Sequence, residues 1–245
     1  MAKLPRRPSK RLIVFVIGGG AAVIVALFLL IYFVIFPTSS PKPFTLSSTT
    51  TSSTLSTPTA SISPSTLTGD WKIATGSEAG YRVREKLAFL PAQSDAVGRT
   101  SQLTGAASFS QSAGNVTIKT ATFDVAVNTL KSDRSMRDEK IHEIGLESNL
   151  YPTATFSLTS PVVVSAGALK GKVAHVSVTG IFNIHGTAKK ETLPVEIGLS
   201  GSTFEAVGSL TFPWSEFGMS APSIGGFVNV TEKATMEFDL HLQRA

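Results

Sequence analysis

From Gly69 to the end of the chain, apolar residues recur at every second position within short segments, and turn residues separate these segments. An extended strand points alternate side chains to opposite faces, so this period predicts strands with one apolar face. The segments are Val116–Leu130, Thr153–Val164, Val173–Ile184, Leu193–Leu199, Ser202–Phe212 and Thr235–Leu242. Many such strands joined by short turns favour one all-β antiparallel domain, a barrel or a sandwich, over residues 69–245.

The apolar faces of these strands are expected to line one common interior. The candidate interior residues are Phe123, Val125, Val127, Phe156, Val178, Phe182, Ile184, Phe204, Leu210, Phe212, Met236, Phe238 and Leu240. Eight strands enclose either packed side chains or one ligand, so these residues leave a filled core and a cavity equally open. Small residues on the same faces, such as Gly180 and Gly208, are compatible with a cavity.

One polar and charged stretch interrupts the strands between Asp124 and Phe156. Within it, Ser135 followed three residues later by Asp138 is typical of a capping box, which predicts a short helix ending at about Ile144. Because this stretch connects two apolar-faced strands, the helix either plugs one end of a barrel or shapes the entrance to its interior.

Several short motifs in this region occur in an order that is typical of one protein family. They are Val97–Thr100, Leu103–Gly105, Arg137–Asp138, Tyr151–Phe156, Val178–Gly180, His185–Lys189, Phe217–Ser220 and Met236–Leu240. With these motifs, residues 69–245 resemble the YceI-like family of lipid-binding bacterial proteins. The resemblance implies a lipocalin-like antiparallel β-barrel of about eight strands that holds a long isoprenoid or other lipid chain. Only this resemblance favours a cavity over a filled core.

Residues 12–36 contain no charged side chain. At about 1.5 Å per residue, a helix of this length exceeds the roughly 30 Å of bilayer hydrocarbon, so a transmembrane helix is predicted. Five cations in residues 1–11 place this basic arm in the cytoplasm and the rest of the chain outside. We expect an uncleaved signal anchor, because the apolar run is longer than the core of a signal peptide; cleavage is the alternative.

The region between the apolar run and the domain, residues 37–68, consists mainly of Ser, Thr and Pro and carries one charge, Lys42. Such a composition buries too little apolar surface to order itself, which predicts a disordered linker. The net charge of +5 also arises before residue 69: six of the 22 basic residues lie there, and all 17 acidic residues follow. The nearly neutral domain therefore gives no support for nucleic-acid binding.

The sequence contains no motif of an enzyme. It has no cysteine and no G-x-S-x-G, and no two histidines have the spacing of zinc ligands. We therefore expect no catalytic residue, no metal site and no cofactor, and we interpret the four histidines, at positions 142, 175, 185 and 241, as surface residues. A hydrolase that uses the carboxylates around Asp138 is the weakest alternative.

Arg134 and Arg137 have two interpretations. If the ligand carries a phosphate, its head must lie at the mouth of the cavity, because an unpaired buried anion is costly, and these arginines would bind it. Alternatively, Arg137 forms an ion pair that fixes the helix to the end of the barrel.

The uncharged N-terminal run predicts a membrane-tethered, extracytoplasmic protein. The family resemblance implies that it holds a polyisoprenoid or an isoprenoid quinone for storage or transport. The alternative is a structural or adhesive module of the cell envelope with a filled barrel that binds protein or glycan.

Overall fold

The computed structural model describes residues 40–46, 67–87, 93–169, 173–224 and 228–245. Residues Pro41–Ala245 form one compact unit, and Met1–Ser40 form a separate one. Within the described ranges no helix is both long and apolar enough to cross a membrane. The predicted membrane helix, residues 12–36, lies outside these ranges, as does the basic arm before it.

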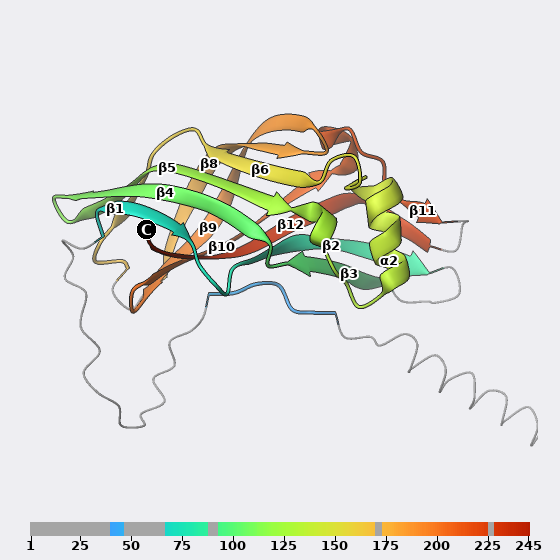
Figure 1. Ribbon diagram of the computed structural model, residues 1–245, viewed down its shortest axis with the longest axis horizontal. Coiled ribbons are helices and arrows are strands. Elements are labelled where there is room, and N and C mark those ends of the chain that lie inside the picture. Colours follow the sequence, from blue (N-terminus) through green and yellow to red (C-terminus); the bar gives the residue numbers. More distant parts are fainter. Residues whose placement is uncertain (1–39, 47–66, 88–92, 170–172, 225–227) are drawn as a thin grey trace, which may run out of the picture. The chain divides into compact units, whose positions relative to one another are not determined.

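The compact unit is built on one antiparallel sheet of twelve strands within the described residues (Figure 1). The strands are β1 (Gly69–Ile73), β2 (Glu78–Leu87), β3 (Gln93–Thr100), β4 (Leu103–Ser112), β5 (Asn115–Ala126), β6 (Thr153–Leu158), β7 (Val162–Ser165), β8 (Ala174–Ile184), β9 (Thr187–Ser200), β10 (Thr203–Pro213), β11 (Ser223–Ile224) and β12 (Val228–Arg244).

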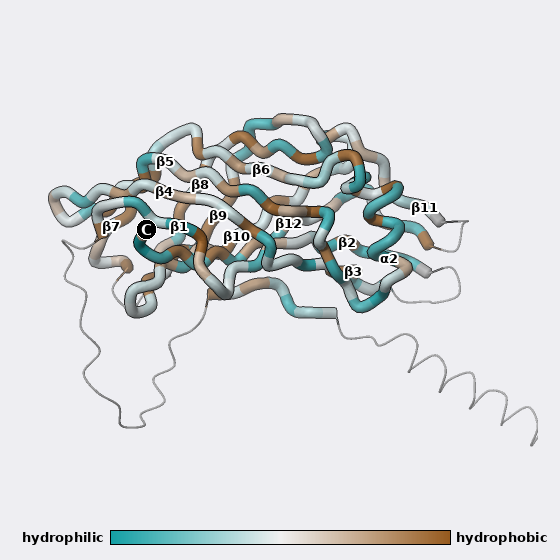
Figure 2. Tube along the Cα trace, viewed as in Figure 1, coloured by the Kyte–Doolittle hydropathy of each residue, from teal (hydrophilic) through white to brown (hydrophobic). Residues whose placement is uncertain are grey.

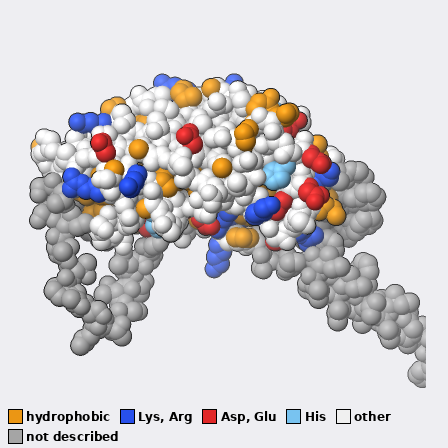
Figure 3. Space-filling view, in the orientation of Figure 1, with side chains coloured by type: hydrophobic (Ala, Val, Ile, Leu, Met, Phe, Trp, Pro, Cys, Tyr) orange, Lys and Arg blue, Asp and Glu red, His pale blue; other side chains and the backbone are white. Residues whose placement is uncertain are grey.

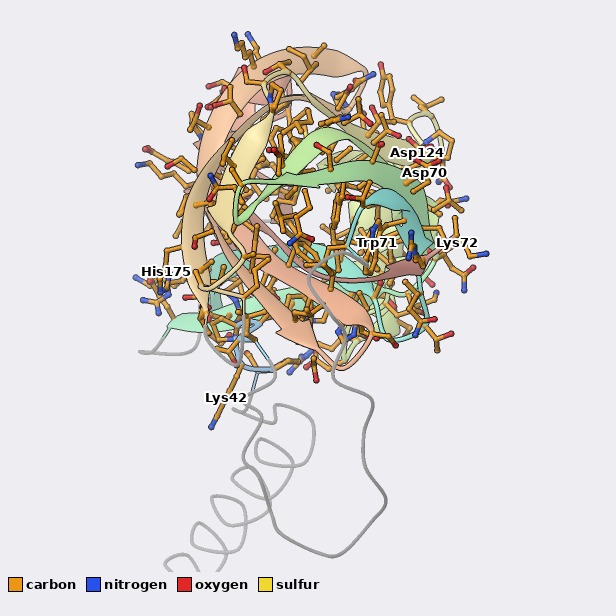
Figure 4. The ribbon with its side chains drawn as sticks, turned by 90° about the vertical axis from the view of Figure 1, so that its left-hand side faces the viewer. Lys42, Asp70, Trp71, Lys72, Asp124 and His175 are labelled. Carbon is orange, nitrogen blue, oxygen red and sulfur yellow. The ribbon has the colours of Figure 1, made fainter. Side chains whose placement is uncertain are left out.

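The sheet closes on itself. Its strands follow the order β1-β4-β5-β6-β8-β9-β10-β12, and β12 pairs with β1 again, with Trp71 opposite Arg244. These eight strands form a barrel that surrounds its interior when viewed along the axis (Figure 4). The first part of β12 pairs instead with β2, which pairs with β3. A bridge between Arg99 and Lys131 joins β3 to the segment before the helix. The all-β antiparallel fold predicted from the alternation is confirmed, and of the two architectures left open, a barrel or a sandwich, the chain forms the barrel that the family resemblance implied.

The charged crossover forms α2 (Ser135–Lys140), which continues into a π-helical turn, Ile141–Gly145. It lies at one end of the barrel and is largely hydrophilic (Figures 1 and 2). The predicted capping box is wrong. The N-cap residue is Arg134, and the Asp138 carboxylate accepts hydrogen bonds from the backbone N–H and hydroxyl of Ser132. Asp138 therefore fixes the loop before the helix.

The strands before Val116 were not predicted individually, although β1 and β4 belong to the barrel and β2 contributes residues to the lining of its cavity. Their inward positions carry small residues such as Ala79 and Ala107, which give a weak apolar pattern. The inward series of β2 also ends in a carboxylate, Glu85. Alternation of hydropathy is clear only where the inward side chains are large and apolar. In these strands it is too weak to predict a strand.

A short part of the predicted linker, residues 41–46, packs on the outside of the barrel, so the prediction of disorder is wrong there. The Arg82 guanidinium donates a hydrogen bond to the Pro41 carbonyl at 2.8 Å, and that of Arg99 donates one to the Lys42 carbonyl at 2.6 Å. The Phe44 ring lies 3.7 Å from the Arg99 guanidinium carbon, and Leu46 is buried. We call residues 41–46 the strap.

Candidate functional site: an apolar cavity inside the barrel

The barrel encloses a cavity of about 160 Å³. At the end that carries β1, its wall includes Phe109 and Phe204, which pack edge to face at 4.8 Å. At the other end, the wall includes Leu130, which precedes α2, and Ile141, which directly follows it. A cavity of this volume holds about one benzene-sized molecule. Since its lining extends between both ends of the barrel, the space is narrow and suits a thin chain better than a compact ring system.

Twelve of the thirteen predicted interior residues line this cavity. They are Phe123, Val125, Val127, Phe156, Val178, Phe182, Ile184, Phe204, Phe212, Met236, Phe238 and Leu240. Leu210 is buried but does not line it, and lies opposite Met236 in the sheet. The structure thus brings nearly all predicted residues together, while their contact with a ligand stays a prediction.

The interior glycines do not widen the cavity, because aromatic rings from neighbouring strands occupy the space beside them. A Cβ atom at Gly180 would lie 2.5 Å from Phe156 Cζ, and one at Gly208 would lie 2.6 Å from Phe238 Cζ. The same arrangement recurs at Gly105 with Phe123 and at Gly98 with Tyr81. Each glycine therefore serves ring packing, and the empty space arises elsewhere along the wall.

At the α2 end, Arg137 forms an ion pair with Glu85, an inward-facing residue of β2; Arg137 Nη2 lies 2.6 Å from Glu85 Oε1. Arg137 also donates a hydrogen bond to Asp133, one turn before it. Burial works against the charge of this guanidinium, but the two carboxylates outweigh it and hold the pKa of Arg137 above its ordinary value. These contacts favour the interpretation in which Arg137 fixes α2 to the barrel.

The other head-group candidate, Arg134, lies 3.7 Å from the Asp133 carboxylate. Further along the crossover, Lys140 and Glu143 form an exposed ion pair at 2.6 Å. Charged side chains gather over this end of the barrel (Figure 3). The Asp138 carboxylate, on which the alternative hydrolase hypothesis rests, accepts a hydrogen bond from the Ser132 hydroxyl. The cavity beside it is lined almost entirely by apolar side chains.

Tyr81 is one of the cavity-lining residues that the sequence analysis missed; others are Phe109, Ile118, Leu193, Val195, Ile197 and Trp214. It lies on β2, lines the cavity and is only 8% exposed. The alternation of Ala79, Tyr81 and Val83 was the signal that pointed to it, but two inward-facing large residues are too few to predict a strand.

The histidines have different environments. His175 is exposed, as expected. His185 is not a surface residue: its side chain is 12% exposed, its Nε2 lies 2.5 Å from Glu147 Oε2, and its ring lies 4.3 Å from that of Tyr151. The loop after α2 covers it, which the position of His185 at a strand end did not reveal.

On the outer face of the barrel, His241 lies beside two carboxylates. Its Nε2 is 3.2 Å from Asp239 Oδ1, and Glu205 faces it from β10. The ligand atoms of these three residues lie within 4.8 Å of one another, which is close enough to share a cation. Burial and the nearby Glu205 raise the pKa of the Asp239 carboxyl, and His241 lowers it. Adjacent strands create this group, so spacing in the sequence did not predict it.

The sequence of the barrel matches the model of one protein family, described as the YceI-like domain, over residues 71–242. The chain belongs to the YceI-like family. No curated protein sequence is similar to it.

Solved structures that resemble this YceI-like protein include the following three. A polyisoprenoid binding domain from Saccharophagus degradans, implicated in plant cell wall breakdown, is 16% identical, with 73% of this chain and 99% of that chain covered and a TM-score of 0.53. BcnA of Burkholderia cenocepacia is 20% identical, with coverages of 66% and 95% and a TM-score of 0.48. The YceI protein of Campylobacter jejuni is 13% identical, with coverages of 60% and 84% and a TM-score of 0.48. Only the first score exceeds 0.5, and at that identity the likeness concerns the fold alone.

Proposed function

We propose that this YceI-like protein binds the chain of an apolar lipid, a polyisoprenoid or an isoprenoid quinone, inside its barrel for storage or transport. The observation that carries the proposal is the narrow apolar cavity whose lining extends between the two ends of the barrel. The Saccharophagus degradans protein, which shares the fold, is described as a polyisoprenoid binding domain.

The hydrophobic effect supplies the affinity. Each CH₂ group transferred from water to the cavity contributes about 0.8 kcal/mol. Because the empty space is benzene-sized, a longer chain fits only when lining side chains move aside. Met219 and Met236 line the cavity and have flexible side chains that suit such adjustment. The proposal therefore includes a barrel that widens as the chain enters.

The N-terminal region extends the proposal to the membrane. The uncharged run of residues 12–36 would anchor the protein, with the basic arm in the cytoplasm and the barrel outside. Anchoring would keep the cavity at a high local concentration beside the bilayer that supplies its lipid. Alkaline extraction of membranes tests this part: the full chain should stay in the membrane pellet, and its release would contradict the anchor.

Mass spectrometry of organic extracts from purified residues 41–245 tests the binding. This compact unit retains the strap, the barrel and its core. We expect an isoprenoid lipid in near-stoichiometric amount. Ala206→Leu fills part of the cavity with an apolar group and should reduce the bound lipid severalfold. Ala188→Leu, on the exposed face of β9, is the matched control and should not.

An extract without lipid from a folded unit would contradict the proposal. The small volume of the cavity would then favour the second candidate, a structural or adhesive module with a filled barrel.

A further inference from the structure

Three aromatic rings close the end of the cavity that lies near β1. Phe109 on β4 and Phe204 on β10 line the cavity there. Trp71 on β1 contacts both rings without lining the cavity: the ring centroids are 5.3 Å apart for Trp71 and Phe109, and 6.3 Å apart for Trp71 and Phe204. We call these three residues the floor. Each is at most 2% exposed, so the floor separates the cavity from solvent at this end.

The floor is held in place from several sides. The Trp71 Nε1–H donates a hydrogen bond to the Leu67 carbonyl at 3.2 Å. β1 pairs with β4 on one side and with β12 on the other, so Trp71 lies where the barrel closes. Phe109 and Phe204 pack edge to face on each other and both contact Trp71. Rings packed in this way have no free space to move into, and the floor therefore acts as a fixed end wall.

A β-bulge between β4 and β5 keeps charge away from the floor. The register shifts there, with Lys119 as the extra residue on β5. Without the bulge, the alternation that points Ala121 inward would also point Lys119 inward. Lys119 is instead exposed, and Ile118 lies opposite Phe109 and lines the cavity. The surroundings of the floor are therefore apolar.

The α2 end of the cavity has a different character. Met219 follows the end of β10 that lies far from Phe204, and it lines the cavity with a flexible side chain. The charged side chains of Arg137 and Glu85 lie at this end. A polar group that leaves water needs polar partners, and the floor offers it none. A lipid in the barrel therefore has its polar end toward α2 and its methyl end toward the floor.

We propose that the floor receives the methyl end of the lipid chain, and that Phe109 and Phe204 set the longest chain that the barrel encloses. The proposal rests on lipid binding in the barrel. It adds the direction in which the chain lies and the residues that limit its length. Chain beyond this limit stays outside the cavity and gains no apolar contacts there, so affinity stops rising with length at the limit.

The test measures the dissociation constants of residues 41–245 for linear isoprenoid alcohols from geraniol to solanesol, in steps of one isoprene unit. Wild-type affinity should rise with chain length up to a limit and not beyond it. Phe109→Ala removes a ring from the floor and leaves a space of roughly benzene size, so the limit should move up by about one isoprene unit. Affinity for the first alcohol beyond the wild-type limit should then increase about tenfold, as expected from burying roughly two more CH₂ groups.

Phe123→Ala is the matched control. It removes the same ring from the cavity wall close to the α2 end of β5, where Phe123 stacks on Phe156. This change widens the cavity without lengthening it, so the limit should stay at the wild-type length.

Two milder variants decide the test if Phe109→Ala does not fold, which thermal melting shows. Phe109→Leu should move the limit in the same direction, with a smaller gain in affinity for the longer alcohol. Ala107 lines the cavity opposite Trp71 in the sheet, so Ala107→Val adds volume above the floor. It should weaken binding of the longest alcohol that wild type encloses.

An unchanged limit in the folded floor variants would overturn the inference, while lipid binding itself would stand. An equal shift in Phe123→Ala would also overturn it, because the wall near α2 would then limit the chain. Wild-type affinity that rises through the whole series would have the same consequence. Failure of wild type to bind any of the alcohols would overturn the proposed function, and the inference with it.

Discussion

Glu237 lies on the outer face of β12, yet its side chain is only 4% exposed. Its carboxylate accepts hydrogen bonds from Arg82 at 3.1 Å and from Arg99 at 2.8 Å. The same two guanidinium groups hold the backbone of the strap. One buried carboxylate therefore orients both arginines, and a single residue links the strap to the barrel wall.

We expect Glu237→Gln to destabilise the protein by on the order of 3 kcal/mol, because Arg99 then lacks a carboxylate partner and Arg82 keeps only Asp95, at 3.2 Å. Urea unfolding of residues 41–245 measures the loss. Glu196→Gln is the matched control, since Glu196 is 44% exposed on β9 and only faces His175 at 3.7 Å. An unchanged unfolding midpoint in Glu237→Gln would show that the arginines do not depend on this carboxylate.

Asp239 gives a prediction about pH. Burial, the largest cause, and the neighbouring Glu205 raise the pKa of its carboxyl, against the opposite effect of His241. The folded protein therefore keeps a proton that the unfolded chain has already released, and this stabilisation is lost as pH rises from about 4 through the raised pKa. Asp239→Asn should remove this loss, so its stability relative to wild type should increase from pH 4 to pH 7.

Thermal melting across this pH range measures the difference. Asp70→Asn, at an exposed position on β1, is the control and should follow wild type at every pH. Parallel curves for Asp239→Asn and wild type would contradict the prediction.

At the scale of elements, an ion pair holds α2 to the barrel, and aromatic rings that pack on glycines of neighbouring strands hold the strands together. The ion pair between Arg137 and Glu85 joins the helix to β2. The ring of Phe156 on β6 covers Gly180 on β8. Both contacts join elements that are far apart in sequence.

Arg137→Ala should destabilise the protein by about 3 kcal/mol, because Glu85 is left buried and unpaired. If Arg137 instead bound a ligand head group, the variant would lose affinity for an anionic lipid with little change in stability. Unfolding and binding measurements on the same variant separate these outcomes. Lys140→Ala removes an exposed ion pair of the same helix and should show no measurable change.

Gly180→Ala should destabilise the barrel by about 2 kcal/mol, because the added methyl group displaces the Phe156 ring. Gly167→Ala is the control: its Cβ would meet only Ser165 Oγ, at 3.6 Å. Denaturant unfolding compares the two variants. Equal stability of both would mean that the ring moves aside at no cost.

At the scale of the whole molecule, the folded unit includes the strap, which precedes the barrel in the sequence. Leu46 lies against Gly198 of β9 while Phe44 lies on Arg99 of β3, so the strap crosses several strands of the outer wall. The folded unit therefore begins at the strap rather than at β1.

Residues 67–245, which lack the strap, should therefore melt several degrees below residues 41–245. Loss of about 1–2 kcal/mol of packing shifts the melting temperature of a domain of this size by roughly 2–8 °C. The control is residues 41–245 with the threonines at positions 47–66 replaced by serine. These replacements should leave the melting temperature unchanged. Equal melting temperatures of the two fragments would mean that the strap adds nothing to stability.

The family resemblance implied the barrel. The sequence by itself determined the all-β class, the short charged crossover and twelve of the residues that line the cavity. These follow from local periodicity: Phe123, Phe182 and Phe238 each sit in a run of alternating residues, and alternation assigns faces without knowledge of neighbours. Only the tertiary structure decided which residues meet. The pairing of Arg137 with Glu85, the contact of the Phe156 ring with Gly180 and the packing of the strap on the barrel all depend on strand register and barrel closure. Those contacts join residues that are distant in the sequence. Local periodicity does not show which distant residues meet in space.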